Sequence, residues 1–165
     1  MNIKNKTIKQ KKSSRFSFFG NEKMISKNKP ENFMPKFEVV SCFVEYKNEI
    51  LLLLRQDHKP QPNTYGVPAG KIDPGENALQ AIQREGKEET QIDLEGAIHF
   101  DKLFVRYPEY DFTYHIFHKK FENKPEVLLN PEEHKSYKRI YPQEALKINL
   151  IQDLDECIKV FYKIN

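Results

Sequence analysis

The sequence predicts an α+β fold in which helices cover a mixed β-sheet. Runs of β-branched and apolar residues outnumber the stretches with helical periodicity, so strands are expected to form most of the structure. Strands and helices do not alternate regularly along the chain, which argues against a purely parallel α/β sheet. The 165 residues suit a single domain.

The first two strands are expected over residues 37–46 and 49–55, joined as a hairpin by Lys47-Asn48. Residues 56–76 contain four prolines and three glycines. This composition predicts a long irregular loop, with a short extended piece near residues 65–67. Loops of this length usually have a functional role.

A helix is expected to begin directly after Asn77. Asparagine is a preferred N-cap, and Gln80, three residues later, completes a capping box. Apolar or small residues and acidic residues then follow separate stripes, as in an amphipathic helix that lies on a sheet. The first stripe contains Leu79, Ile82 and Gly86, and the second contains Glu85, Glu88 and Glu89.

The second half of the chain predicts another hairpin, a further strand and two helices. The hairpin strands are expected over residues 98–107 and 111–121, and the further strand over residues 136–141. A helix is expected to start at Pro142, and apolar spacing predicts a terminal helix over residues 151–164.

Charge is distributed unevenly along the sequence. Residues 1–36 contain ten lysines and arginines against two acids, a net charge of +8, whereas residues 37–165 contain 17 against 22, a net charge of −5. Such a basic, polar head is typical of a disordered tail, although it could also bind nucleic acid or anionic lipid. We therefore expect a disordered tail over residues 1–35 and a folded domain over residues 36–165, and a chain that begins at Met34 is expected to keep its fold.

The acidic remainder disfavours sequence-specific nucleic-acid binding, because phosphate contacts need clustered lysine and arginine. Only two cysteines, Cys42 and Cys157, are present, so the sequence predicts no disulfide framework and favours a reducing compartment. No apolar stretch approaches the ~18–20 residues that span a bilayer. We therefore expect a cytoplasmic protein that does not bind membranes, and its oligomeric state is left open.

Three glutamates, Glu85, Glu88 and Glu89, are crowded on one side of the predicted helix. Like charges at spacings of three and four residues repel each other by roughly 0.2–0.5 kcal/mol per pair. A bound divalent cation would relieve this repulsion, and Mg²⁺ or Mn²⁺ prefers carboxylate oxygens. A solvated acidic helix face is the alternative.

The spacing around these glutamates is specific. In "GKIDPGENALQAIQREGKEETQI", Gly70 is followed by Glu76 after five residues and, after seven more, by Arg84-Glu85 and then by Glu88-Glu89. This pattern resembles the Nudix box of the Nudix hydrolase superfamily, G-x5-E-x7-R-E-U-x-E-E-x-G-U, where U is a bulky apolar residue. Two positions depart from it, because Gly86 replaces the first U and Gln91 replaces the last glycine.

The resemblance to MutT-like Nudix hydrolases implies a fold and a reaction. The implied fold is an α/β/α sandwich around a central mixed sheet. The implied reaction is metal-dependent hydrolysis of a nucleoside diphosphate linked to another group, with a nucleotide as the small-molecule substrate and Mg²⁺ or Mn²⁺ as the cofactor.

The resemblance also implies roles for individual residues. Glu85, Glu88 and Glu89, with the Gly70 carbonyl, would hold one to three cations. Either Glu85 or an acid in a later loop would serve as the general base. Arg84 and Glu76 would orient the metal shell, and Arg55, at the end of a predicted strand, is a candidate phosphate ligand or a plain surface charge. A further carboxylate would come from Glu132 or Glu133 in the segment "EEHKSYKRIYPQEA", unless these are ordinary surface acids.

The substrate remains open at this level. Nucleoside triphosphates are favoured by the chain's length and by the family analogy. ADP-ribose or nucleotide sugars are suggested by Pro108, and dinucleoside polyphosphates by Tyr110. One of the aromatic residues is expected to stack on a nucleobase, and the candidates are Tyr65, Tyr107, Tyr110, Phe112 and Tyr114.

Two other classes of function compete with hydrolysis. A non-catalytic nucleotide-binding regulatory module should lack one or more carboxylates of the box, and here all are present. An isomerase of the isopentenyl-diphosphate type uses this fold with a catalytic cysteine, but Cys42 lies in a strand that is predicted to be buried.

Overall fold

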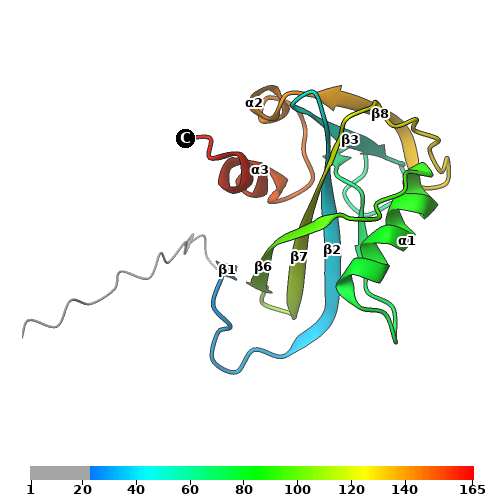
Figure 1. Cartoon of the computed structure of the whole chain (residues 1–165). Coiled ribbons are helices and arrows are strands. Elements are labelled where there is room, and N and C mark those ends of the chain that lie inside the picture. The colour runs from blue at the N-terminus through cyan, green and yellow to red at the C-terminus, as the bar shows by residue number, and fades with distance from the viewer. Residues whose placement is uncertain (1–22) are drawn as a thin grey trace, which may run out of the picture.

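A mixed β-sheet crosses the molecule, with one long helix on one face and two shorter helices on the other (Figure 1). The structure, a computed structural model, describes residues 23–165. This architecture confirms the expected α+β sandwich. The strands are β1 (Met24–Ser26), β2 (Pro35–Tyr46), β3 (Glu49–Arg55), β4 (Tyr65–Gly66), β5 (Ala69–Lys71), β6 (Ile98–Arg106), β7 (Asp111–Phe121) and β8 (His134–Ile140), and the helices are α1 (Ala78–Thr90), α2 (Pro142–Ala145) and α3 (Leu154–Tyr162).

The long strand β2 organises the sheet. The strand order is β1-β6-β7-β2-β3-β4, with β5 also paired to β2 and β8 also paired to β3. Strand β2 runs parallel to β7 along its whole length, whereas the other named strand pairs are antiparallel. The first predicted hairpin forms at Lys47-Asn48, but its strands pair only at Tyr46↔Glu49 and Glu45↔Ile50. Because the two strands then diverge, β2 is free to pair with β5, which carries Gly70.

Alternation along the central strands builds a core on each face of the sheet. In β3, Leu51 and Leu53 belong to the cluster that packs beneath α1, whereas Ile50 and Leu52 belong to the cluster beneath α3. All four side chains are buried. This two-residue periodicity is expected for a strand that is covered on both faces, and it holds α1 and α3 on opposite sides of the sheet (Figure 1).

The cap of α1 and its special positions follow the sequence prediction. Asn77 and Gln80 form the expected capping box, with reciprocal hydrogen bonds of 3.0 and 2.9 Å. Gln91 adopts the left-handed conformation, with φ of 59°, where the family pattern has glycine. A Cβ atom on Gly86 would lie 2.6 Å from a methyl carbon of Leu94. Glycine at position 86, where the family pattern has a bulky apolar residue, therefore leaves room for the segment after the helix to pack closely against α1.

The shorter elements differ in extent from the predictions. Strands β4 and β5 lie within the predicted irregular loop, and only β4 had been expected as an extended piece. Strand β8 begins at His134, two residues before the predicted start. Helix α3 begins at Leu154 because Asp153 is left-handed, with φ of 69°, and this conformation cannot continue a helix from residue 151.

The N-terminal boundary of the fold needs correction. Residues 23–35 had been assigned to the tail, but β1 pairs with β6 at the sheet edge. Phe33 is only 5% exposed and contacts Phe104 edge to face, at 5.2 Å between ring centroids. Arg106 donates a 3.0 Å hydrogen bond to the Asn32 carbonyl. Apolar burial therefore anchors the segment before Met34. The rest of the predicted tail, residues 1–22, lies outside the described residues.

We expect Phe33→Ala to lower the free energy of unfolding by about 3 kcal/mol, the lower end of the range for a buried phenylalanine, because the residue lies at the sheet edge. Met34→Ala is the matched control, since the neighbouring side chain is 80% exposed and its loss should cost less than about 0.5 kcal/mol. Urea unfolding of both variants measures the difference. Equal stabilities would mean that the segment before residue 35 adds nothing to the fold.

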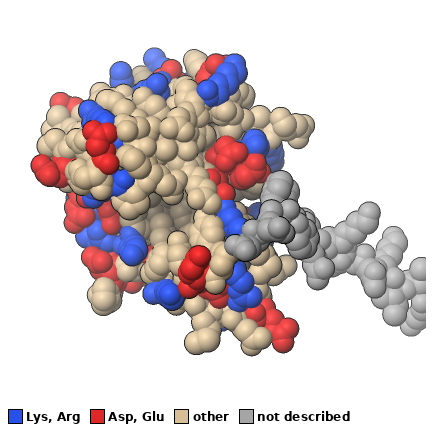
Figure 2. Space-filling model, turned by 180° about the vertical axis from the view of Figure 1, so that it is seen from behind, with Lys and Arg blue, Asp and Glu red and all other residues tan. Residues whose placement is uncertain are grey.

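The charged side chains of the described domain are mixed. On the face drawn in Figure 2, lysines and arginines are interspersed with aspartates and glutamates rather than gathered into one basic patch.

Among residues 23–165, none of the helices combines the length and the apolar character that crossing a lipid bilayer requires.

Candidate functional site

The predicted site residues lie where α1 packs against β5. Ala81, Ile82 and Gly86 face the core from α1, and the neighbouring stripe of the helix, with Glu85 and Glu89, lies along β5. The short strand β5 is held in place by antiparallel pairing with β2, at Val40↔Gly70. Helix and strand therefore approach each other closely at Gly70.

Glu85 lies directly over Gly70. A methyl group on Gly70 would overlap the Glu85 carboxylate, since all three nearest atoms belong to that group. Glycine is thus required here for space and not for an unusual backbone conformation. The structure brings these two predicted metal-binding residues together, although they are fifteen positions apart in the sequence.

Arg84 connects the carboxylates of the motif. Its guanidinium donates to both carboxylate oxygens of Glu76, at 2.8 and 3.0 Å, and to the Lys71 carbonyl at 2.9 Å. It also donates to Glu85 at 2.7 Å and to Glu88 at 3.1 Å. This geometry supports the orienting role expected for Arg84 and Glu76, because the planar guanidinium fixes several carboxylates at once.

Glu85 is the electrostatically strained member of the cluster. Burial raises the pKa of Glu85 to about 7, and the nearby charges of Glu89 and Glu88 add to this effect, while Arg84 opposes it. Glu88 is 57% exposed at the side chain and contacts Arg84. Of the three glutamates, Glu85 is therefore the one most affected by the charge repulsion that the sequence predicts.

Glu89 contacts a different set of groups. Its carboxylate accepts a 3.0 Å hydrogen bond from the Ala69 amide and lies 3.0 Å from His134 Nε2. Both side chains are buried, and burial raises the pKa of Glu89 while the contact with His134 lowers it. His134 Nδ1 has no hydrogen-bond partner within the described residues. Glu133 lies beside this pair, with ligand atoms of all three residues within 4.8 Å of one another.

His134 is not among the site residues predicted from the sequence, and Glu132 and Glu133 are equal candidates at that level. The structure places Glu133 with Glu89, because β8 begins at His134 and runs antiparallel to β3. His134 lies directly opposite Arg55 in this ladder. The adjacent Glu133 and His134, just before a predicted strand, were the signal in the sequence for this part of the site. The sequence did not show which strand would pair with that predicted strand.

A cleft extends from Glu89 and His134. It encloses about 160 Å³, and its walls include Arg55, Tyr114 and Gln152. The Arg55 Nε donates a 2.8 Å hydrogen bond to the Pro60 carbonyl, which holds the side chain at the cleft. The candidate phosphate ligand therefore shares a cavity with part of the glutamate cluster.

A second chamber of about 210 Å³ adjoins this cleft and shares Val39, Tyr114, Ile151 and Gln152 with it. Its walls are mainly aromatic and aliphatic side chains in equal measure. The Tyr107 and Phe112 rings lie parallel at 5.9 Å between centroids, and the Tyr107 hydroxyl donates a 3.0 Å hydrogen bond to Asp153. Four of the five aromatic candidates line this chamber, namely Tyr107, Tyr110, Phe112 and Tyr114.

The donor set fits a hard divalent cation. Glu85, Glu88, Glu89 and Glu133 offer carboxylate oxygens, the ligands that Mg²⁺ and Mn²⁺ prefer. Burial, with like charges nearby as a smaller cause, raises the pKa of Glu85 and of Glu89, and a bound cation would stabilise the charged form of both carboxylates. The structure places Glu85 against Gly70, Glu88 against Arg84, and Glu89 with Glu133 and His134. The metal-binding roles of these residues remain predictions.

Comparisons with known proteins agree with this geometry. A model of the NUDIX domain family matches residues 35–161. The human protein 8-oxo-dGDP phosphatase NUDT18 is 34% identical over 59 residues, which are 36% of this chain and 18% of that relative. This chain therefore matches less than a fifth of the curated relative's length.

Solved structures with a similar fold include the following three. An Ap4A hydrolase binary complex from C. elegans has a TM-score of 0.63 at 25% identity, covering 77% of this chain and 96% of that one. The MutT protein of Methanosarcina mazei Go1 has a TM-score of 0.64 at 22% identity, covering 78% and 94%. The NUDIX domain of Shewanella oneidensis NrtR, complexed with ADP ribose, has a TM-score of 0.67 at 17% identity, covering 81% and 91%. The latter two, below 25% identity, bear on the fold alone.

Proposed function

Because the chain belongs to the Nudix family, we propose that it is a metal-dependent pyrophosphohydrolase that cleaves a nucleoside triphosphate or a related nucleotide. The observation that carries the proposal is the placement of Glu85 over Gly70 within the carboxylate network of Arg84. This network adjoins a cleft that contains Arg55 and leads to an aromatic chamber. Carboxylates that can hold a metal, a guanidinium for the phosphates and aromatic side chains for the base suit hydrolysis of a nucleotide diphosphate bond.

A divalent cation, when bound, neutralises charge on the phosphoryl oxygens and makes a water molecule more acidic. Glu85, Glu88 and Glu89, with the Gly70 carbonyl, would hold it. Arg84 keeps the carboxylates in place through hydrogen bonds to Glu85 and Glu88, and its bidentate pair with Glu76 fixes its own orientation.

Proton transfer and substrate binding are assigned to groups along the cleft. Glu85 is assigned the role of the base that takes a proton from the attacking water, because its carboxylate lies against Gly70 within the carboxylate cluster. Arg55 binds the phosphate chain, since a guanidinium matches phosphate oxygens well. The nucleobase stacks in the aromatic chamber beside Tyr107 and Phe112.

The adjoining chambers also favour a second candidate substrate. A dinucleoside polyphosphate or ADP-ribose carries a group on both sides of its diphosphate, and the cavity continues past the cleft in the direction of Tyr107. The similar structure named as an Ap4A hydrolase makes a dinucleoside polyphosphate a reasonable member of a test panel.

The remaining alternatives have less support. A regulatory module is disfavoured because every glutamate of the motif is present. A cysteine-dependent isomerase is disfavoured because Cys42 is fully buried and its pKa is raised to about 12 by burial. Cys42 and Cys157 are free thiols, in keeping with the proposed location in the cytoplasm.

A substrate panel tests the proposed function. The purified full chain is incubated with nucleoside triphosphates, ADP-ribose, a nucleotide sugar and diadenosine tetraphosphate, each with Mg²⁺, Mn²⁺ or EDTA. We expect metal-dependent conversion of a triphosphate to a nucleoside monophosphate and pyrophosphate, resolved by ion-exchange chromatography. Faster cleavage of ADP-ribose or of the dinucleotide would select the second candidate. Nucleotide binding by calorimetry without turnover of any compound would favour the regulatory module.

A further inference from the structure

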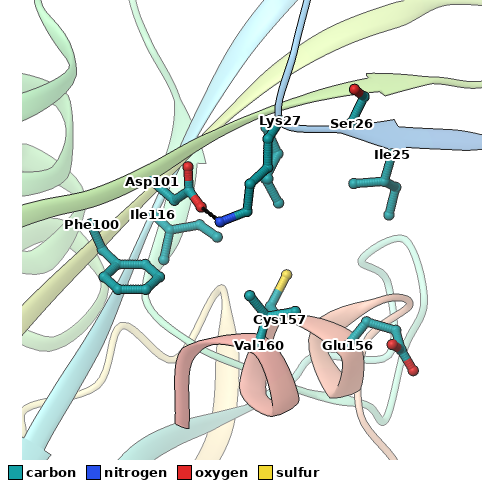
Figure 3. Close-up of a pocket in the computed structure, with 10 residues that line it drawn as sticks. Ile25, Ser26, Lys27, Phe100, Asp101, Ile116, Glu156, Cys157 and Val160 are labelled. Atoms are coloured by element: carbon teal, nitrogen blue, oxygen red, sulfur yellow. Dashed lines mark ion pairs between the residues drawn. The ribbon is translucent and has the colours of Figure 1, made fainter. Parts of the chain in front are cut away.

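Ion pairs between a lysine and a carboxylate occur at several places in the described domain, and most of them lie away from the glutamate cluster. Lys27 and Asp101, for example, lie 2.5 Å apart beside an apolar pocket of about 50 Å³ between β1, β6 and α3 (Figure 3). This pocket has no part in the proposed reaction. The ion pair between Lys59 and Glu133 is different, because its carboxylate lies in the candidate active site.

Glu133 is held beside Glu89 by backbone hydrogen bonds. The Glu133 amide donates to the Asn130 carbonyl at 3.1 Å, which closes a tight turn, and the Asn130 amide donates to the Glu89 carbonyl at 3.0 Å. The turn is therefore tied to the end of the helix that carries the glutamate cluster. Ligand atoms of Glu133, Glu89 and His134 lie within 4.8 Å of one another. Glu133 can therefore add a carboxylate oxygen to this cluster.

Lys59 reaches Glu133 from the turn that follows β3. Its Nζ lies 3.0 Å from Glu133 Oε2. The Lys59 amide donates to the Gln56 carbonyl at 3.2 Å, which closes the turn, and the Gln56 amide donates to the Glu133 carbonyl at 3.0 Å. Arg55 directly precedes this turn and donates a hydrogen bond to the Pro60 carbonyl, which directly follows it. One short stretch of the chain therefore carries two cationic side chains, one at the cleft and one on Glu133.

The ion pair is weak enough for Lys59 to change partners. The side chains of Lys59 and Glu133 are 28% and 37% exposed, and ion pairs that solvent reaches contribute about 0–1 kcal/mol. The phosphate chain of a nucleotide carries several negative charges, and a lysine ammonium on its flexible stem binds phosphate as a point charge. A phosphate chain in the cleft would therefore compete with a single carboxylate for Lys59.

We propose that Lys59 is a second phosphate-binding residue, which is held on Glu133 in the free protein and moves to the phosphate chain when substrate binds. This exchange releases the Glu133 carboxylate, which then joins Glu89 in holding the divalent cation. Phosphate and metal favour the same rearrangement, so the binding of each strengthens the binding of the other. The inference rests on the proposed function, because it assigns Lys59 a role at that same site.

Lys59→Met tests the exchange, because its two expected effects have opposite signs. Inorganic triphosphate in excess Mg²⁺ should bind the full chain at least ~10-fold more weakly, the scale of one hydrogen bond to a charged group. Mn²⁺ alone should bind at least ~3-fold more tightly, because Glu133 loses a competing cation whose pairing lies in the range of exposed ion pairs. Isothermal titration calorimetry measures the first constant, and the electron paramagnetic resonance signal of free Mn²⁺ measures the second.

Lys135→Met is the matched control. Lys135 follows His134 in the sequence and pairs with Asp57 at 2.6 Å, so its loss removes the same charge nearby without touching Glu133. Both constants should stay within about twofold of the parent's values. A second test adds Lys59→Met to Glu133→Gln. With the carboxylate already gone, the loss of Lys59 should no longer tighten Mn²⁺ binding, because the two residues act as a pair.

Three outcomes would overturn the proposal. Weaker binding of both triphosphate and Mn²⁺ in Lys59→Met would show that Lys59 only keeps Glu133 in position. Unchanged constants would show a surface ion pair with no role in binding. Equal tightening of Mn²⁺ binding in Lys135→Met would show a general effect of charge. None of these measurements needs turnover or a nucleobase, so a failure of the proposed function appears separately, as absent hydrolysis in the substrate panel.

Discussion

Glu88→Gln should lower turnover on a nucleotide that the parent cleaves by at least ~10²-fold, the scale seen when a main electrostatic stabiliser is removed. The change is nearly isosteric and removes a charge from a side chain that is 57% exposed and hydrogen-bonded to Arg84. Folding should therefore be retained, and the loss would reflect the missing metal-ligating oxygen. Steady-state kinetics with Mg²⁺ measure the effect.

Thermal unfolding provides a second readout for this variant. A cation that binds only the folded state stabilises it by RT ln(1 + [L]/Kd), about 2.7 kcal/mol at a hundredfold excess over Kd. The parent should therefore gain thermal stability from Mn²⁺ relative to EDTA, and Glu88→Gln should gain markedly less at the same ionic strength. Glu122→Gln is the matched control, since Glu122 is an exposed glutamate outside the site. Equal gains in all three proteins would mean that Glu88 does not hold the cation.

Gly70→Ala should also lower turnover by at least ~10²-fold, although it adds only a methyl group. That methyl group overlaps the Glu85 carboxylate, which is the far end of a flexible side chain. The side chain can therefore rotate away without unfolding the domain, and the misplaced carboxylate is what reduces activity. We expect the melting temperature in EDTA to stay within a few degrees of the parent's value.

A double-mutant cycle tests this cause. If Gly70→Ala acts by displacing Glu85, then adding it to Glu85→Gln should cost little further activity, because interacting positions are not additive. Full additivity would show that Gly70 acts by another route, such as its backbone carbonyl. A Gly70→Ala variant that keeps turnover within about threefold would contradict the observed position of Glu85 over Gly70.

The corrected N-terminal boundary matters for both experiments. Residues 23–33 belong to the folded domain through β1 and Phe33, so a chain shortened to Met34 would confuse a loss of stability with a loss of catalysis. The full chain is the appropriate parent for every variant above.

Much of the site was determined by the sequence itself, because its geometry is local. Arg84, Glu85 and Glu88 lie within five residues on one helix, and helical spacing alone places Glu88 one turn after Arg84. The capping box of Asn77 and Gln80 and the left-handed Gln91 at the helix end also depend only on neighbouring residues. Such local features can be predicted correctly even where the prediction for the rest of the fold is wrong.

Only the tertiary structure decided which distant residues meet this helix. Glu89 lies against His134, 45 positions away, because β8 pairs with β3 in a register that places His134 opposite Arg55. The three residues of β1 are too few to show a periodicity, and their place in the sheet depends on the edge that β6 offers. Sheet pairing joins segments with any separation in the sequence, and its register is set by packing on both faces, which a local pattern does not contain.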